Sequence, residues 1–433
     1  MNIHFITFGC KVNLYETENM KQTFGKLGYT VCRTEKDCDI FVINSCTVTE
    51  SGDKKLFKEL RRLRREYPDA VIAVTGCYPQ TFTNELPVIP EADIITGTKN
   101  RNLLPSLIED FISQKNKIIS ISPYSGIDKF EDMCNEGYTD NTRAFVKIQD
   151  GCNMFCSYCI IPYSRGRFRS KPIDELKKEV TGLAEAGYKE IVLVGINLSF
   201  YGIEFGLRLV DAIEAVCETD GIERVRLGSL EPEIISDNDI KRMSMLDKLC
   251  PQFHLSLQSG CDKTLKAMNR RYTTSDYQNL VDKLRNAFDN CAITTDVMIG
   301  FPDETDEDFN ESLNFVRSIG FSKVHIFPYS PRKGTPAAEM DNQVSNHVKN
   351  QRAAKMSAIA TESQQKFLQN QVGRTIPVLF EREKRDKIPH GYTPNYTLVK
   401  IFTKISEKSL RNRIFYVKIE RIDNDYCVGE IIS

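Results

Sequence analysis

The sequence predicts an α/β protein with three units: an N-terminal doubly wound parallel sheet, a central incomplete (β/α) barrel of the TIM kind, and a small C-terminal antiparallel β-barrel. Short apolar strands alternate with helical segments over residues 1–115 and again over residues 143–344. Residues 371–433 contain short alternating strands joined by charged turns. A chain of 433 residues is too long for one hydrophobic core, so several units are expected.

The N-terminal unit, residues 1–115, begins with the apolar run IHFITFG and a helical segment around ETENMKQTFGKLG. The alternation continues with DIFVINS, a helix through KKLFKELRRLRREY, and the runs AVIAVTG and ADIITG. Short apolar strands of this kind are typical of the buried middle of a parallel sheet. Residues 116–142 are rich in Ser, Gly, Asp and Asn and show no sustained period, so we predict a linker there.

The central unit, residues 143–344, contains six strand-like runs next to helical stretches such as DELKKEVTGLAEAG. The runs are AFVKIQD, EIVLVGIN, RVRLGSL, FHLSLQS, ITTDVMIGF and KVHIFPYS. Six such units do not complete the eight-fold barrel, so we expect an incomplete one with its site where the strands end.

The C-terminal part begins with a long polar helix, predicted over residues 345–370, which leads into the small barrel at 371–433. From Gln371 onward the chain has 12 Lys or Arg against 8 Asp or Glu, whereas the whole chain has 58 against 59. Overall charge therefore argues neither for nor against nucleic acid, but the C-terminal part is the basic one.

The location of the protein is predicted from what its sequence lacks. No stretch approaches about eighteen uninterrupted apolar residues, so we expect no membrane-spanning helix and no membrane partner. Residues 1–14 have no basic lead-in and no small-residue cleavage site, so they read as a first strand of a cytoplasmic protein. In a reducing cytosol, fourteen cysteines are more often ligands, catalytic groups or buried residues than disulfides.

Three cysteines, Cys152, Cys156 and Cys159, form a CxxxCxxC motif directly after the strand AFVKIQD. A structural zinc site would need a fourth Cys or His ligand, and none of the five histidines is close in sequence. Three thiolates can hold an iron–sulfur cluster that leaves one iron open. At the end of the first barrel strand, this spacing resembles that of radical SAM enzymes, whose open iron binds S-adenosylmethionine.

Other barrel strand ends carry groups suited to a long, polar cofactor. Backbone carbonyls and an amide could meet an ammonium group, hydroxyl and carboxylate groups could bind a ribose, and an apolar bed could hold adenine. The residues are Gly195 and Asn197 at the second strand, Ser229 and Glu231 at the third, Gln258 at the fourth, and Ile299 and Gly300 at the fifth. Each alone is more often structural, but their recurrence at one end of the barrel favours cofactor binding.

The N-terminal unit repeats one pattern three times. Cys10, Cys46 and Cys77 each end an apolar strand, and they are 36 and 31 residues apart. The carboxyl ends of parallel strands meet at the edge of the sheet where ligands bind. We therefore predict a second open three-thiolate cluster, which only the fold can assemble.

These motifs together resemble the radical SAM methylthiotransferases from end to end. The stretches are TFGCKVNLYETENM, INSCTVT, VTGCYPQ, DGCNMFCSYCIIPYSRGRFRS, FHLSLQSGCDKTLKAMNRRYT and DVMIGFPDET. The NLYETE and IIPYSRGRFRS versions are most similar to the branch that acts on N6-threonylcarbamoyladenosine (t6A) at tRNA position 37.

The resemblance implies two [4Fe-4S] clusters, S-adenosylmethionine and a flavodoxin- or ferredoxin-like electron donor. The cluster on Cys152, Cys156 and Cys159 would split S-adenosylmethionine to give a 5′-deoxyadenosyl radical. The cluster on Cys10, Cys46 and Cys77 would hold a sulfur that a second S-adenosylmethionine methylates, and the methylthio group would be transferred to C2 of adenine. A radical is needed because this C–H bond is not acidic and carries no leaving group.

The expected partner is a tRNA anticodon stem-loop, where an unpaired base can be turned into a pocket; no DNA partner is expected. The final barrel resembles the TRAM module of RNA-modifying enzymes, and RNA contacts by its cations should weaken as salt rises. The candidate RNA-binding residues are Arg165, Arg167 and Arg169 after the cluster loop, and Lys400, Lys404, Arg411 and Arg413 in the final barrel.

Several alternatives stay open. The same chemistry could act on isopentenyladenosine (i6A) at tRNA position 37, or on an aspartate of a ribosomal protein. A protein of another class would use the six cysteines for structural zinc and bind RNA without catalysis. Arg270, Arg271 and Lys147 are candidates for the group that binds the carboxylate of S-adenosylmethionine.

Overall fold

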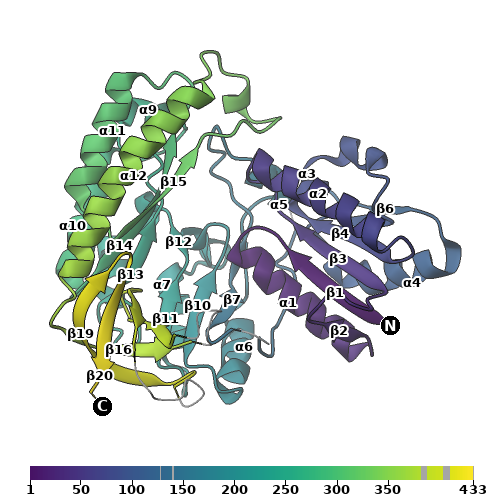
Figure 1. The fold of residues 1–433 in the computed structure, drawn as a ribbon, viewed down its shortest axis with the longest axis horizontal. Coiled ribbons are helices and arrows are strands. Elements are labelled where there is room, and N and C mark those ends of the chain that lie inside the picture. The colour runs from purple at the N-terminus through teal and green to yellow at the C-terminus, as the bar shows by residue number, and fades with distance from the viewer. Residues whose placement is uncertain (127, 139–140, 382–387, 403–409, 433) are drawn as a thin grey trace.

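The computed structural model describes residues 1–126, 128–138, 141–381, 388–402 and 410–432. It confirms the predicted α/β class (Figure 1): an N-terminal parallel sheet lies on one side, a half-open wall of parallel strands occupies the centre, and a closed five-stranded β-barrel follows at the C-terminus.

The N-terminal sheet has six parallel strands in the order β2-β1-β3-β4-β5-β6. The strands are β1 (Asn2–Thr7), β2 (Thr30–Cys32), β3 (Ile40–Ser45), β4 (Val71–Gly76), β5 (Ile94–Thr96) and β6 (Ile118–Ser120). The chain runs from β1 to β2 in one direction and from β3 to β6 in the other, so the strand order reverses between β1 and β3. This reversal is the switch point at which ligands bind in doubly wound sheets.

Helices cover both faces of this sheet. On one face, α2 (Glu50–Glu66) packs Leu56, Leu60 and Leu63 against β3 and β4, because these three leucines recur at helical spacing. On the other face lie α1 (Lys11–Lys26) and α4 (Leu104–Gln114). Short helices η1 (Thr83–Val88), η2 (Arg101–Leu103) and α3 (Cys77–Thr81) complete the unit. The sheet extends further than expected, because β6 begins inside the segment that we predicted as a linker.

The central wall consists of parallel strands in two sheets, β11-β10-β7 and β12-β13-β14-β15. The strands are β7 (Ala144–Lys147), β10 (Glu190–Val194), β11 (Arg224–Leu227), β12 (Ser229–Leu230), β13 (Gln252–Leu255), β14 (Ala292–Ile299) and β15 (Lys323–Pro328). Only Gly228 separates β11 from β12, so the two sheets form one curved, incomplete barrel with six strand positions, as predicted.

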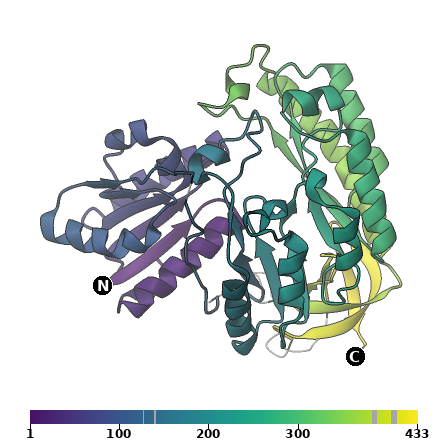
Figure 2. The ribbon, with the colours of Figure 1, turned by 180° about the vertical axis from the view of Figure 1, so that it is seen from behind.

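The outer face of this wall is covered by helices, as the view from behind shows (Figure 2). They are α6 (Ile173–Glu185), α7 (Leu209–Cys217), α8 (Asp237–Met243), α9 (Asp262–Ala267), α10 (Thr274–Ala287) and α11 (Asp306–Ile319). The largest apolar core of the protein lies between these helices and the outward-facing strand residues. The short elements β8 (Gln149–Asp150), α5 (Ile161–Arg165) and β9 (Arg169–Ser170) follow β7.

The C-terminal barrel is reached through the long helix α12 (Asn346–Gln369), which is capped by the Ser345 side chain. Its strands are β16 (Thr375–Phe380), β17 (His390–Tyr392), β18 (Leu398–Lys400), β19 (Ile414–Asp423) and β20 (Tyr426–Ile431). They close in the order β16-β17-β18-β20-β19, and all pairs are antiparallel except β18 with β20. Across the described ranges, no helix combines the length and apolarity needed to cross a membrane.

The turn at residues 393–397 of this barrel docks against the amino ends of the central strands. Arg226 donates to the carbonyls of Thr393 and Pro394, at 3.2 and 2.9 Å. The Tyr396 ring stacks on Tyr392 at 4.7 Å, and the guanidinium groups of Arg226 and Arg143 lie 4.5 and 5.1 Å from its centre. The C-terminal barrel therefore lies at the end of the central wall opposite to the strand ends that precede the cysteines.

Candidate functional site

The three cysteines of the N-terminal unit follow three adjacent strands. Cys10 lies at the amino end of α1 just after β1, Cys46 follows β3, and Cys77 follows β4 as the first residue of α3. Because β1, β3 and β4 are neighbours and parallel, these residues share one edge of the sheet. The edge lies at the switch point of strand order, where ligands bind in doubly wound sheets.

Two glycines allow the backbone to approach this edge closely. Gly9 and Gly76 have φ of 103° and 101°, in the region that favours glycine. A Cβ atom on Gly9 would lie 2.7 Å from Cβ of Cys46, and one on Gly76 would lie 2.4 Å from the Ser45 carbonyl oxygen. A side chain at either position would therefore displace the backbone around the cysteines.

A buried arginine lies beneath these thiols. Arg165 of α5 is fully buried and donates to Glu16 Oε1 at 2.6 Å and to Asn13 Oδ1 at 2.7 Å. Desolvation raises the pKa of the Cys46 thiol to about 12, and the Arg165 guanidinium partly opposes that effect at both Cys46 and Cys10. Arg165 thus provides positive charge where three thiolates would be held.

The expectation that Arg165 and Arg169 contact RNA is wrong, because both side chains are interior. Arg165 pairs with Glu16 and Asp150, and Arg169 pairs with Asp150 at 3.0 Å and lies 4.8 Å from the ring centre of Tyr124. A sequence pattern of alternating arginines does not reveal whether the guanidinium groups are solvated or paired with carboxylates far away in the chain. Arg167, between them, is exposed.

The other predicted RNA contacts are in the C-terminal barrel. Arg411 and Arg413 are exposed and Lys400 is half-buried. Lys404 lies outside the described residues. A role in RNA binding stays a prediction for all of them.

Glu16 of α1 joins the N-terminal unit to the central wall. It is fully buried and pairs with Arg101 at 3.0 Å, Lys147 at 2.7 Å and Arg165 at 2.6 Å. Burial opposes its ionisation, but these three cations outweigh that effect and lower the pKa of Glu16 to about 2. Lys147 is committed to this network, so it is not placed to bind the carboxylate of S-adenosylmethionine.

The CxxxCxxC motif forms a loop between β8 and α5. The loop is fixed by backbone bonds, including Cys159 N to Cys156 O at 2.9 Å and Ser157 N to Met268 O at 3.0 Å. Desolvation raises the pKa of Cys152 to about 11 and that of Cys159 to about 12, and the three thiols act on one another electrostatically. They are therefore close enough to share one cluster.

This second triad also has an arginine. Arg270 Nη1 lies 3.3 Å from Cys156 Sγ, and the Arg270 guanidinium is paired with Glu231. A guanidinium at this distance donates a hydrogen bond to a thiolate sulfur. The sequence suggested Arg270 only as a carboxylate ligand, because its distance to Cys156 depends on how α9 packs against the loop.

Asn197 fits a site for an additional polar ligand. It is buried, its Nδ2 lies 3.8 Å from Cys152 Sγ, and its backbone N–H donates to Gln149 Oε1 at 2.7 Å. Its Oδ1 atom is buried and has no hydrogen-bond partner among the described residues. A buried acceptor without a partner is costly, and an ammonium group beside the cluster would satisfy it.

The remaining predicted cofactor residues lie where their strands end. Gly195 follows β10, Ser229 starts β12 with an exposed side chain, and Gly300 follows β14, where its N–H donates to Glu304 Oε1 at 3.0 Å. Gln258 forms an isolated parallel bridge with Val297 and has φ of 65°. Ile299 needs correction: its side chain is 1% exposed and packs in the outer core, so it does not line an apolar bed for adenine.

The N-terminal unit lies across the open side of the central wall. At one end Val12 packs on Val192 and Val194 of β10, and at the other Arg332 Nη2 donates to Thr47 Oγ1 at 2.7 Å. Helix α3, which begins with Cys77, packs on α5, which follows the CxxxCxxC loop, so the two triads lie on adjoining parts of the two units. In the part of the chain described above, no group of three or more His, Cys, Asp or Glu side chains is placed to hold a single metal ion. A four-iron cluster binds each thiolate at a different iron, so its ligands stand further apart than those of one ion.

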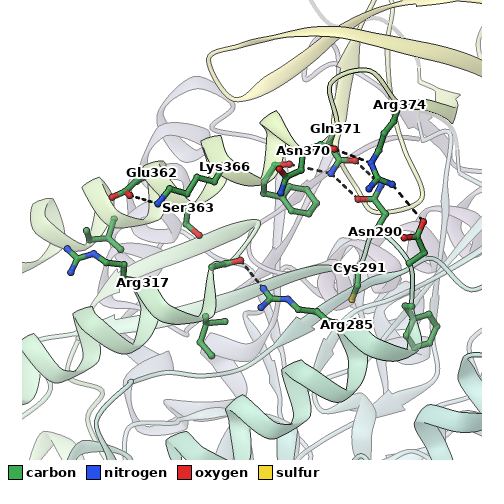
Figure 3. Close-up of a pocket in the computed structure, with 16 residues that line it drawn as sticks. Arg285, Asn290, Cys291, Arg317, Glu362, Ser363, Lys366, Asn370, Gln371 and Arg374 are labelled. Atoms are coloured by element: carbon green, nitrogen blue, oxygen red, sulfur yellow. Dashed lines mark hydrogen bonds and ion pairs between the residues drawn. The ribbon is translucent and has the colours of Figure 1, made fainter.

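A groove of about 640 Å³ lies elsewhere, between the carboxyl ends of α10, α11 and α12 (Figure 3). Its cations are engaged: Lys366 pairs with Glu362 at 2.6 Å, and Arg285 donates to the Gly320 carbonyl at 2.9 Å. The helices of a β/α barrel end at the amino ends of its strands, so this groove is remote from the cysteines.

Comparison with known proteins agrees with this arrangement. A family model described as Radical SAM superfamily matches residues 146–316, and one described as Uncharacterized protein family UPF0004 matches residues 2–97. A structure of TsrM, a radical S-adenosylmethionine methyltransferase from Kitasatospora setae, aligns with a TM-score of 0.58 and 11% identity. The alignment covers 78% of this chain and 74% of that chain and shows a shared fold.

Two relatives match this chain along nearly its whole length. Threonylcarbamoyladenosine tRNA methylthiotransferase MtaB of Bacillus subtilis is 38% identical over 438 residues, covering 99% of this chain and 96% of the relative. The tRNA-2-methylthio-N(6)-dimethylallyladenosine synthase of Caldicellulosiruptor saccharolyticus is 36% identical over 442 residues, covering 99% and 92%. Identity at this level across three successive units shows that the chain belongs to the radical SAM methylthiotransferases.

Proposed function

We propose that this protein transfers a methylthio group to C2 of N6-threonylcarbamoyladenosine at position 37 of tRNA. The observation that carries the proposal is the pair of cysteine triads on adjoining parts of the two units, each with a buried arginine beside it. One triad alone would suffice for a simple radical reaction, whereas sulfur insertion needs a second site that holds the sulfur.

The residues present fit the two clusters. Cys152, Cys156 and Cys159 would hold the [4Fe-4S] cluster that binds S-adenosylmethionine, with the Asn197 amide beside it. The edge of β1, β3 and β4 would hold the second cluster on its own three cysteines. When bound, the clusters and S-adenosylmethionine supply the electron, the hydrogen-abstracting radical and the sulfur.

The chain's own residues position these groups and balance their charge. Arg165 and Arg270 offset the negative charge of the thiolates, and Glu16 holds Arg165 in place from the N-terminal unit. The pairing of α1 with β7 and α5 through Glu16 keeps the two cysteine sites at a fixed separation. Such fixed placement is the protein's part in cofactor chemistry.

The choice of t6A rests on the relatives that carry that substrate in their names. They include the Bacillus subtilis protein and one from Chlamydia pneumoniae that is 35% identical over 428 residues. Relatives named for dimethylallyladenosine are nearly as similar, so i6A is the second candidate. The RNA substrate and a flavodoxin- or ferredoxin-like electron donor belong to the same proposal.

Nucleoside mass analysis of tRNA tests the proposal. In a strain without this protein, t6A should accumulate and its 2-methylthio form should be absent, and plasmid expression of the chain should restore it. A Cys152→Ala plasmid should not restore it. Loss of the 2-methylthio form of i6A instead would overturn the choice of substrate, and an unchanged nucleoside profile would overturn the function.

A further inference from the structure

The inner face of the central wall is open to solvent beside β15. Val324 and Ile326 of β15 pack outward on the core, so Lys323, His325 and Phe327 point to the inner side of the wall. All three are exposed, and Phe327 is 47% exposed. A substrate can therefore approach, along this face, the edge of the N-terminal sheet that carries Cys10, Cys46 and Cys77.

Lys11 projects into the same space from the N-terminal unit. It directly follows Cys10, and its neighbour Val12 packs on Val192 and Val194 of the inner wall. The Lys11 side chain is exposed. Tyr396 and Arg143 lie close enough to interact electrostatically with the Lys11 ammonium. Lys11 is also close enough to His325 of β15 for such an interaction.

The position of Lys11 is unfavourable for the protein alone. It is the first residue of α1, a helix of 16 residues with no acidic residue in its first turn, so a cation lies at the positive end of the helix dipole. Arg143 and Arg226 add further positive charge nearby, and Glu190 is already paired with Arg226 at 2.8 Å. Within the described ranges, the Lys11 ammonium forms neither a hydrogen bond nor an ion pair.

Other polar groups around this space are already committed. His254 Nε2 lies 3.3 Å from Asp296 Oδ2, and its Nδ1 lies 3.0 Å from Thr294 Oγ1. The Asp296 carboxylate of the inner face therefore has a partner of its own. An ammonium without a hydrogen-bond or ion-pair partner in the described part of the chain, on the first residue of the helix that follows Cys10, indicates a site for an anionic group.

We propose that Lys11 binds the carboxylate on the N6 substituent of the target adenosine and so selects a threonylcarbamoyl over an isopentenyl group. This inference rests on the proposed function, since it needs the adenine to lie beside the Cys10 edge. The threonylcarbamoyl group carries a carboxylate, whereas the isopentenyl group is an uncharged hydrocarbon. The ammonium supplies a charge-assisted hydrogen bond to the first and nothing to the second.

Binding of synthetic anticodon stem-loops tests this inference without measuring turnover. The loops differ only at position 37, which carries t6A, i6A, unmodified adenosine, or t6A with its carboxylate blocked as a methyl ester. Affinities of the anaerobically reconstituted protein are measured at one fixed salt concentration. The iron content of each variant is measured in parallel, because Lys11 is next to Cys10.

Wild-type protein should bind the t6A loop about 10- to 100-fold more tightly than the ester or unmodified loops, the range of one hydrogen bond to a charged group. Lys11→Met should abolish this preference and leave the other three affinities within about twofold. Lys11→Arg should keep most of it. Lys26→Met, at the other end of α1, is the matched control and should change nothing.

Each other outcome has a defined meaning. If the wild type binds the ester as tightly as t6A, or if Lys11→Met keeps the t6A preference, the inference is wrong while the proposed function stands. If Lys11→Met weakens all four loops equally, Lys11 contacts the RNA backbone and the inference is also wrong. If the wild type prefers i6A to t6A, the proposed substrate itself is wrong. The ester comparison uses wild-type protein, so it decides the matter even if Lys11→Met loses iron.

Discussion

Replacing Glu16 by Gln tests whether the buried ion network holds the two units together. The change keeps the side-chain volume and removes the one negative charge shared by Arg101, Lys147 and Arg165. A pKa lowered from 4.5 to about 2 corresponds to a contribution of about 3 kcal/mol to the free energy of unfolding, since one pKa unit is about 1.4 kcal/mol. This figure is similar to the cost of removing one partner of a buried ion pair, which is about 3 to 5 kcal/mol.

Urea unfolding of the metal-free protein at pH 7, followed by circular dichroism, measures this loss. The urea concentration at the midpoint should fall by an amount equivalent to about 3 kcal/mol, and the slope of the unfolding free energy against urea concentration should not change. Glu50→Gln is the control, because Glu50 pairs with Lys54 on the exposed surface of α2, where solvent screens the pair, and should leave the midpoint nearly unchanged. Equal midpoints for the two variants would refute the reasoning.

The difference should also depend on pH in a defined direction. Because the pKa of Glu16 is lowered in the folded protein, its contribution is complete above about pH 4.5 and is lost as the pH falls toward 2. The gap between wild type and Glu16→Gln should therefore shrink over that interval. A gap that stays constant down to pH 2 would mean that the charge of Glu16 is not its cause.

The remaining predictions concern the cysteines. Alanine at all three positions of the CxxxCxxC motif should lower the iron content of anaerobic protein from about eight to about four atoms per chain, and zinc without acid-labile sulfide in the wild type would contradict this. Arg270→Met removes the donor 3.3 Å from Cys156 Sγ, so the reduction potential of that cluster should become more negative in an electron paramagnetic resonance titration. Arg270→Lys should restore the potential in part. An unchanged potential in Arg270→Met would exclude the contact. In metal-free protein, desolvation raises the pKa of the Cys46 thiol to about 12. Alkylation of Cys46, followed by mass spectrometry, should therefore be slow at pH 8 and accelerate only as the pH approaches that pKa. Fast alkylation at pH 8 would contradict the raised pKa.

The strand-end cysteines could be predicted because the signal is local. Each of the runs before Cys10, Cys46 and Cys77 is apolar over consecutive residues, as a buried parallel strand requires, and each ends in a cysteine. The order of the strands then brings the three residues to one edge. Strand β6 is only three residues long and partly exposed, unlike the equally short but fully buried β5, and the polar stretch that follows it favours a linker in the sequence.

The polar interior could not be predicted because its partners are far apart in sequence. Glu16 is a polar residue in a helix that otherwise has no strong apolar stripe, and its partners are 85, 131 and 149 residues away at Arg101, Lys147 and Arg165. Side chains of this kind are usually assigned to a solvated face. The error at Arg165 and Arg169 has the same origin, since burial of a charge depends on a carboxylate that the local sequence does not reveal.

The two triads differ in how their cysteines are spaced along the chain, and this sets how much of the fold is needed to keep each triad together. Cys152, Cys156 and Cys159 lie within one loop of eight residues, so the local sequence alone keeps them near one another. Cys10, Cys46 and Cys77 meet only after three strands have paired in parallel, which is a slow, long-range event in folding. The proposed cluster in the loop is therefore expected to tolerate loosening of the fold, whereas the proposed cluster at the sheet edge is expected to be lost once β1, β3 and β4 separate.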